Sequence, residues 1–281
     1  MLSRRWLINA VLVVVIAALA WLGLRVDDVE DAASSQRISE LTPSEVNRIE
    51  ITAPGLALAL RRETGGWLIE RPILWPANAG NIKRLLGILE QAATPVADAS
   101  STDAAALGLQ PPAASWLLDD TRLDFGAINP IGERRYLLVN SKLYLLPDVH
   151  LAFATQGLPG MVDRRLLPRS DEIARLRLPA VDIVRDDTGE YRAADRPQLA
   201  SQVLAELVEN WRSLPANGIR AFDLDANPGE LISLRLASGE ELDFLLQSRE
   251  PEIVIANPQI GLQYHFRGDF REQLIAPRDG G

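Results

Sequence analysis

The chain carries two histidines, His150 and His265, which are the first candidates for acid–base or metal chemistry. A general base or a metal ligand needs partners that converge on it within hydrogen-bond or coordination distance. The nearest acids along the chain are Asp148 and Asp269, one near each histidine. Such isolated pairs are typical of surface strands or loops, so we expect both histidines there. We predict no metal and no cofactor.

The carboxylate pairs Asp119-Asp120 and Asp186-Asp187 fall between strand-like runs, where turn chemistry accounts for them. Residues 124–126 spell Asp-Phe-Gly, the metal-binding tripeptide of protein kinases, but neither a glycine-rich phosphate loop nor a His-Arg-Asp loop accompanies it. The sequence also lacks the nucleophile elbow of hydrolases, a zinc-protease helix motif and a P-loop. We therefore expect a non-enzymatic protein in which the tripeptide ends a strand.

The stretch "FGAINPIGERRY", residues 125–136, is the best candidate for a functional loop. Its Asn-Pro and Ile-Gly pairs predict a tight turn followed by charged side chains. One interpretation is a plain hairpin connection, and the other is a loop that docks a partner or ligand. Trp75, in "ILWPAN", is either exposed for binding or caps the core of the following helix. The candidate interaction residues are Trp75, Asn129, Pro130, Glu133, Arg134 and Arg135.

The bulk composition narrows the class of protein. Net charge is −9 over 281 residues, with a pI near 4.9, and nucleic-acid binding requires a basic face instead. There is no cysteine, so disulfides, thiol catalysis and cysteine-ligated zinc are excluded. Hydrophobic content of 47% is ordinary for a globular protein rather than a disordered one.

The N-terminal stretch "MLSRRWLINAVLVVVIAALAWLGLRVDDVED" indicates attachment to a membrane. Residues 6–24 carry no charge, and at about 1.5 Å per residue they reach roughly 28 Å, close to the hydrocarbon thickness of a bilayer. Arg4 and Arg5 precede this run and an acid-rich stretch, 27–31, follows it. The positive-inside bias then predicts a single-pass inner-membrane protein, with a cytoplasmic N-terminus and a periplasmic body.

Two other interpretations of the N-terminal run remain open. The first is a cleaved signal peptide, since Ala18-Leu19-Ala20 has the small-x-small form of a cleavage site. The apolar run continues to Leu24, however, which is longer than usual for a signal peptide. The second is a buried helix of a soluble protein. Both the membrane anchor and the cleaved signal peptide place the body of the protein outside the cytoplasm.

Two similar stretches, "TGGWLIERP" at 64–72 and "TGEYRAADRP" at 188–197, indicate that the chain is built twice. In each half, two strand-like runs lead to a Thr-Gly turn, then to a helical pattern (78–93 and 199–214), then to two hairpins. Five elements recur in the same order. We therefore predict an α+β fold with an N-terminal transmembrane helix followed by two tandem repeats of antiparallel sheet plus packed helix.

The predicted domain boundaries follow from this pattern. A cytoplasmic stub and anchor occupy 1–25, a linker 26–45, the first repeat 46–160, an inter-repeat linker 161–172, and the second repeat 173–281. The linker includes "MVDRRLLPRS", whose arginines either stay solvated or contact an anionic lipid or an acidic partner.

The first half resembles a known family of unknown function, DUF4340. The resemblance covers about residues 40–165, through "W-x-I-x-x-P" at 67–72, "LGLQPPAASWLL" at 107–118, "LDFGAINPIGERRYLL" at 123–138 and "LYLLP" at 143–147. The second half matches as a weaker copy. The resemblance implies a membrane-anchored bacterial protein with an extracytoplasmic body, in some members near ABC-transporter systems of the gliding-motility type. It implies no catalytic residues.

The expected function is therefore that of a non-enzymatic accessory or scaffold subunit of an envelope complex, plausibly with a transporter-like partner, held to inner-membrane lipid through residues 6–24. The alternative is a periplasmic ligand-binding module for polysaccharide, peptidoglycan or lipid. An apolar pocket near Trp75 or Trp116 would favour that alternative. An enzyme would need a cleft with several buried acids and ranks third.

Overall fold

The computed structural model of the chain describes residues 36–168, 171–222 and 229–277. The predicted membrane run, residues 6–24, lies outside the described residues. Contacts divide the chain into two compact units: residues up to Leu56 together with Lys83–Ala152, and Ala57–Ile82 together with Phe153–Gly281.

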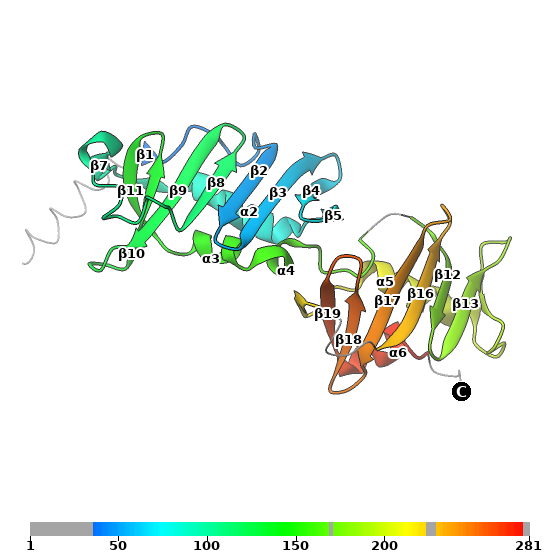
Figure 1. Cartoon of the computed structure of the whole chain (residues 1–281). Coiled ribbons are helices and arrows are strands. Elements are labelled where there is room, and N and C mark those ends of the chain that lie inside the picture. Colours follow the sequence, from blue (N-terminus) through cyan, green and yellow to red (C-terminus); the bar gives the residue numbers. More distant parts are fainter. Residues whose placement is uncertain (1–35, 169–170, 223–228, 278–281) are drawn as a thin grey trace, which may run out of the picture. The chain divides into compact units, whose positions relative to one another are not determined.

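A nine-stranded sheet, here called the first sheet, has the order β5-β4-β3-β2-β8-β9-β10-β11-β7 (Figure 1). Its strands are β2 (Arg48–Ala53), β3 (Leu56–Glu63), β4 (Gly66–Arg71), β5 (Trp75–Pro76), β7 (Ala97–Asp98), β8 (Ala114–Leu118), β9 (Thr121–Ile128), β10 (Arg134–Val139) and β11 (Lys142–Pro147). A separate two-stranded sheet pairs β1 (Gln36–Arg37) with β6 (Ala92–Ala93). The helices of this half are α2 (Ala79–Leu86), the 3-10 helices η1 (Gly87–Glu90) and η2 (Ala99–Ser101), α3 (His150–Thr155) and α4 (Gly157–Met161).

An eight-stranded sheet, the second sheet, has the order β14-β13-β12-β16-β17-β18-β19-β15. Its strands are β12 (Ile173–Leu178), β13 (Val181–Arg185), β14 (Tyr191–Ala193), β15 (Gly218–Ala221), β16 (Glu230–Leu236), β17 (Glu241–Ser248), β18 (Glu252–Asn257) and β19 (Leu262–Arg267). Its helices are α5 (Ser201–Ser213), η3 (Gly268–Phe270) and α6 (Arg271–Leu274).

Seven strands follow the same order in both large sheets: β4-β3-β2-β8-β9-β10-β11 in the first, and β14-β13-β12-β16-β17-β18-β19 in the second. The two Thr-Gly stretches occupy equivalent places, between β3 and β4 and between β13 and β14. In each half, a helix follows three of these strands in the sequence. In the first half α2 comes after β2, β3 and β4, with the short β5 between, and in the second half α5 comes after β12, β13 and β14. Residues of β11 can therefore be compared directly with residues of β19.

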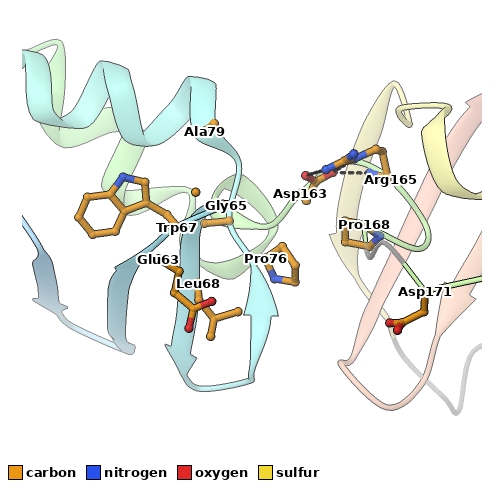
Figure 2. Close-up of a pocket in the computed structure, with 12 residues that line it drawn as sticks. Glu63, Gly65, Trp67, Leu68, Pro76, Ala79, Asp163, Arg165, Pro168 and Asp171 are labelled. Atoms are coloured by element: carbon orange, nitrogen blue, oxygen red, sulfur yellow. Dashed lines mark hydrogen bonds and ion pairs between the residues drawn. The ribbon is translucent and has the colours of Figure 1, made fainter. Parts of the chain in front are cut away.

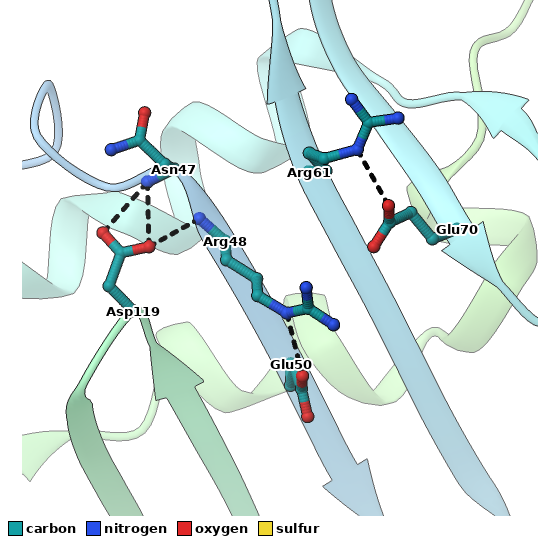
Figure 3. Close-up of polar contacts among 6 residues, drawn as sticks. All are labelled: Asn47, Arg48, Glu50, Arg61, Glu70 and Asp119. Atoms are coloured by element: carbon teal, nitrogen blue, oxygen red, sulfur yellow. Dashed lines mark hydrogen bonds and ion pairs between the residues drawn. The ribbon is translucent and has the colours of Figure 1, made fainter.

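Alternation along each strand gives the sheets one apolar face and one polar face. In β2, Ile49 and Ile51 are buried while Arg48 and Glu50 are not. On the polar face, Arg48 bonds Glu50 at 3.0 Å and Arg61 bonds Glu70 at 2.8 Å (Figure 3). These exposed pairs make a solvated surface and contribute little to stability.

The apolar faces carry the helices. In the first sheet, Ile82, Leu85 and Leu86 of α2 are buried, and Figure 1 shows α2 lying across this sheet. In the second sheet, α5 buries a stripe at helical spacing, and the indole N–H of Trp211 donates to the carbonyl of Leu274 at 2.8 Å. The stripe consists of Leu204, Leu207, Val208 and Trp211.

The predicted fold class is wrong. The part of the chain that the structure describes is mostly β, with 45% strand, 19% helix and three sheets. Among the described residues no helix is both long and apolar enough to span a bilayer. The helical pattern over 78–93 yields only the eight residues of α2, because Gly87 begins a tighter 3-10 turn and Ala92–Ala93 then pair as a strand.

Candidate functional site

The candidate loop is a tightly built turn between β9 and β10. The amide of Asn129 donates to the carbonyl of Arg134 at 2.7 Å, and the side-chain oxygen of Asn129 accepts the amide of Ile131 at 2.9 Å. Gly132 and Glu133 both have positive φ, 88° and 52°, which reverses the chain. The turn is therefore held by its own backbone and by one asparagine side chain.

This turn presents apolar side chains to solvent. Ile131 is 85% exposed and Ile128, where β9 ends, is 48% exposed. Burying an isoleucine is worth about 1.5–3 kcal/mol, so an ordered turn that displays two of them has contact surface to offer. We call residues 128–134 the hairpin tip.

The two arginines that follow differ in role. Arg135 is largely buried. It donates two hydrogen bonds to Asp148, from Nε at 2.7 Å and from a terminal nitrogen at 2.8 Å, and a third to the carbonyl of Gly126. Arg134 is exposed and lies across from Pro147 at the start of β10. Arg135 therefore fastens the base of the hairpin, and Arg134 faces solvent.

The structure brings together four of the six candidate residues, Asn129, Pro130, Glu133 and Arg134, in the hairpin tip. Trp75 lies in β5 and is only 2% exposed, so it offers no surface. Trp116 is 0% exposed and packs against Phe125 with a ring separation of 4.5 Å. The apolar pocket that a ligand-binding module would need therefore cannot use either indole ring.

A groove that sequence reasoning missed adjoins the hairpin tip. It has a volume of about 390 Å³ and lies between the segment after η1 and the outer edge of β11. We call it the edge groove. Its lining residues are Gln91–Thr94, Val96, Arg134 and Leu145–Pro147. Val96 is 52% exposed there.

The edge groove exists because β7 leaves β11 early. Pairing between these strands reaches only Lys142 and Leu143, and the amide of Val96 still donates to the carbonyl of Leu143 at 2.8 Å. The next residue is Pro95, and proline is typical of the ends of strands rather than of their paired interiors. Thr94-Pro95-Val96 was thus the signal in the sequence that could have located the groove.

A second hollow, of about 460 Å³, lies beside the Gly65–Gly66 turn, in the unit that comprises Ala57–Ile82 and Phe153–Gly281 (Figure 2). Its lining mixes polar and apolar residues, and Arg165 there is bonded to Asp163 at 2.6 Å, which raises the pKa of the arginine. Pro168 and Asp171 line it on either side of residues 169–170, which are outside the description. We therefore base no site on it.

The sequence predicts both histidines on the surface, but neither side chain lies on an open surface. His265, in β19, is 7% exposed and sits between Glu252 and Gln263, each at 3.1 Å from a ring nitrogen. His150 begins α3 and is half-buried, and this burial lowers the pKa of its ring. The ring of His265 packs into the protein, and His150 lines a hollow of only about 10 Å³.

The carboxylate pairs have structural roles. Asp119 accepts the amides of Asn47, at 3.0 Å, and Arg48, at 2.7 Å (Figure 3). Asp186 accepts the hydroxyl of Thr188, which with further turn bonds lowers the pKa of this carboxyl. Both aspartates lie in turns, as the sequence predicts, but Asp119 bonds a distant segment whereas Asp186 bonds within its own turn.

In the Asp-Phe-Gly tripeptide, Asp124 bonds Ser115 and Arg122 on the polar sheet face. Gly126 lies against the carbonyl of Leu107.

Within the described ranges, no group of three His, Cys, Asp or Glu side chains is arranged to hold a metal ion. Comparison of the chain with family models, with curated proteins and with solved structures finds no match.

Proposed function

We propose that this chain is a non-enzymatic accessory subunit of an envelope complex, attached to the inner membrane through the apolar run at residues 6–24. Its periplasmic body binds another envelope protein through the hairpin tip. The observation that carries the proposal is the exposure of Ile131, 85%, on a turn whose backbone is internally bonded.

An ordered apolar tip suits protein binding for a thermodynamic reason. A loop that is already held in one conformation loses little conformational entropy when it docks, so more of its contact energy appears as affinity. Ile128 and Arg134, the first and last residues of the tip, supply an apolar and a charged contact beside Ile131. The sequence resemblance to membrane-anchored envelope proteins supports the same class of function.

Site-specific photocrosslinking tests the proposal in intact cells of the native host. A photoreactive phenylalanine analogue replaces Ile131 in one variant and Leu231, which is 59% exposed on β16, in a matched control. We expect a discrete protein adduct from position 131 and none of the same mass from position 231. Absence of a protein adduct at 131, or the same adducts from both positions, would overturn the proposal.

A further inference from the structure

We propose that the edge groove binds an extended peptide segment of the partner, with the peptide bonded to the edge of β11 and a carboxylate of the peptide paired with Arg134. This inference rests on the proposed function and gives the chemistry of the partner. It assigns the apolar part of the contact to Val96, Leu145 and Pro147, and the polar part to the main chain of Leu145 and the side chain of Arg134.

The main chain of β11 offers a donor and an acceptor to the groove. Peptide groups along a strand point alternately to its two edges. The carbonyls of Ser141 and Leu143 accept the amides of Ala99, at 2.9 Å, and Val96, at 2.8 Å, on the outer edge. The peptide groups of Leu145, two residues further on, face that same edge beyond the end of the β7 pairing.

The second sheet shows what fits at this place. Counted from the hairpin pairs Val139↔Lys142 and Asn257↔Leu262, the residue equivalent to Leu145 of β11 is His265 of β19. There the edge is covered by an extended strand, β15, in which Gly218 pairs with His265. In the second sheet β15 therefore covers this edge as far as His265, whereas in the first sheet β7 stops at Leu143 and the edge at Leu145 has no paired strand among the described residues.

The positive charge of Arg134 favours a peptide that carries a carboxylate. Arg134 is the charged residue of the groove lining, which otherwise consists of neutral side chains. Among the described residues Arg134 forms no ion pair, whereas Arg135 beside it is bound to Asp148. A carboxylate is the natural partner of an arginine that keeps its donors available. The net charge of −9 also disfavours binding of acidic peptides elsewhere on this protein.

The lining gives the peptide an apolar floor. Leu145 is half-buried, while Pro147 and Val96 are exposed, and all three line the groove. Its volume of about 390 Å³ is in the range of sites that hold small ligands or a few residues. Strand addition uses such a floor for alternate side chains and the strand edge for main-chain bonds.

The test uses the full chain in detergent and two pools of acetylated, amidated pentapeptides. Both pools have Val, Ile, Leu or Phe at four positions. The remaining position is taken by Asp in one pool and by Asn in the other, and each of the five positions is used in turn. Retention on the immobilised protein is measured by mass spectrometry. We expect the best-retained Asp peptide to bind about two- to fivefold more tightly than its Asn counterpart, the range for one exposed ion pair.

Two variants locate the site. Arg134→Gln should abolish the preference for Asp, whereas Arg122→Gln, at another exposed arginine of the same sheet, should preserve it. Leu145→Pro removes the edge N–H and should weaken both pools equally, with circular dichroism showing that the fold persists. Retention of neither pool, or an Asp preference that survives Arg134→Gln, would overturn this inference. A protein adduct from position 131 would still support the proposed function in that case.

Discussion

Asp119, in the turn between β8 and β9, connects this turn to the start of β2, because its carboxylate accepts the amides of Asn47 and Arg48. It also holds a positive φ of 49°, which aspartate and asparagine tolerate better than alanine does. We expect Asp119→Ala to lower the free energy of unfolding by about 2 kcal/mol, because two charge-assisted bonds and a favourable turn residue are lost. Urea unfolding measures this loss. Asp120→Ala, at the exposed neighbour, is the control and should change stability by less than about 0.5 kcal/mol.

Asp182 gives a prediction about pH. Arg175 bonds its carboxylate, at 2.8 Å from Nε, and this bond, with Arg177 nearby, lowers the pKa of Asp182 in the folded protein. A lowered folded pKa means that the ion pair stabilises the fold fully above the unfolded value of about 4. That contribution is lost as pH falls through the lower folded value.

Unfolding of wild type and Asp182→Asn between pH 7 and pH 2 measures this effect. The wild type should be the more stable protein at pH 7, and the difference should shrink as Asp182 becomes protonated below about pH 4. Asp187→Asn, at an exposed turn carboxyl, should track the wild type throughout. A difference for Asp182→Asn that stays constant down to pH 2 would contradict the assignment.

At the residue scale, the sequence predicts turns well and burial less well. Asp119, Asn140 and Gly239 occupy turns with positive φ, because short polar residues and glycine have few alternatives there. The burial of His265 and the pairing of Arg135 with Asp148 depend on strands that approach from elsewhere in the sheet, so local sequence does not determine them.

At the scale of elements, the packing of the loop at 107–109 on β9 explains the glycine of the Asp-Phe-Gly tripeptide. A Cβ at Gly126 would lie 2.5 Å from the carbonyl oxygen of Leu107 and 3.1 Å from Leu109, and the amide of Ala127 donates to that same carbonyl at 2.8 Å. The loop that contains "LGL" at 107–109 therefore packs so closely on the strand that contains "FG" at 125–126 that position 126 requires glycine.

Gly126→Ala should therefore destabilise the protein by about 1–3 kcal/mol, since the backbone of the loop must move to admit one methyl group. Thermal and urea unfolding measure the change. Gly65→Ala is the matched control because its Cβ would meet nothing within 4 Å. Equal stability of the two variants would show that the 107–109 loop yields freely.

Alternating hydrophobicity and turn residues predicted the long strands of both sheets, whose side chains alternate between faces. The class prediction failed because the short strands β5, β6, β7 and β15 have only two to four residues each, too few for a period to register. The hairpin tip was predicted from its turn signals, whereas the edge groove depends on where β7 leaves β11.

At the scale of the whole molecule, the shared order of seven strands allows one sheet to be interpreted through the other. In the second sheet β15 pairs with the outer edge of β19 up to His265, whereas in the first sheet β7 pairs with the outer edge of β11 only up to Leu143. A difference between two otherwise equivalent sheets is a place where new contacts can be made. The proposed docking of a partner at this edge follows from that difference.

Membrane attachment is a second prediction at this scale, based on the sequence of residues 6–24. The intact chain should remain in the membrane pellet after alkaline carbonate washing, because an apolar run of this length is held by the bilayer core. Replacing three leucines or valines in the middle of the run by lysine should release the protein. Recovery of the intact wild type with freely soluble cytosolic proteins would contradict this prediction.

The most direct test of the central claim compares two single substitutions in the full-length protein. Ile131→Asp places a charge on the hairpin tip, and Leu231→Asp places one on an exposed apolar residue of the second sheet. The partner identified by crosslinking is quantified after gentle detergent solubilisation and purification of each variant. We expect Ile131→Asp to lower partner recovery about tenfold or more and Leu231→Asp to leave it at the wild-type level. Full recovery with Ile131→Asp would contradict the assignment of the hairpin tip as the binding surface.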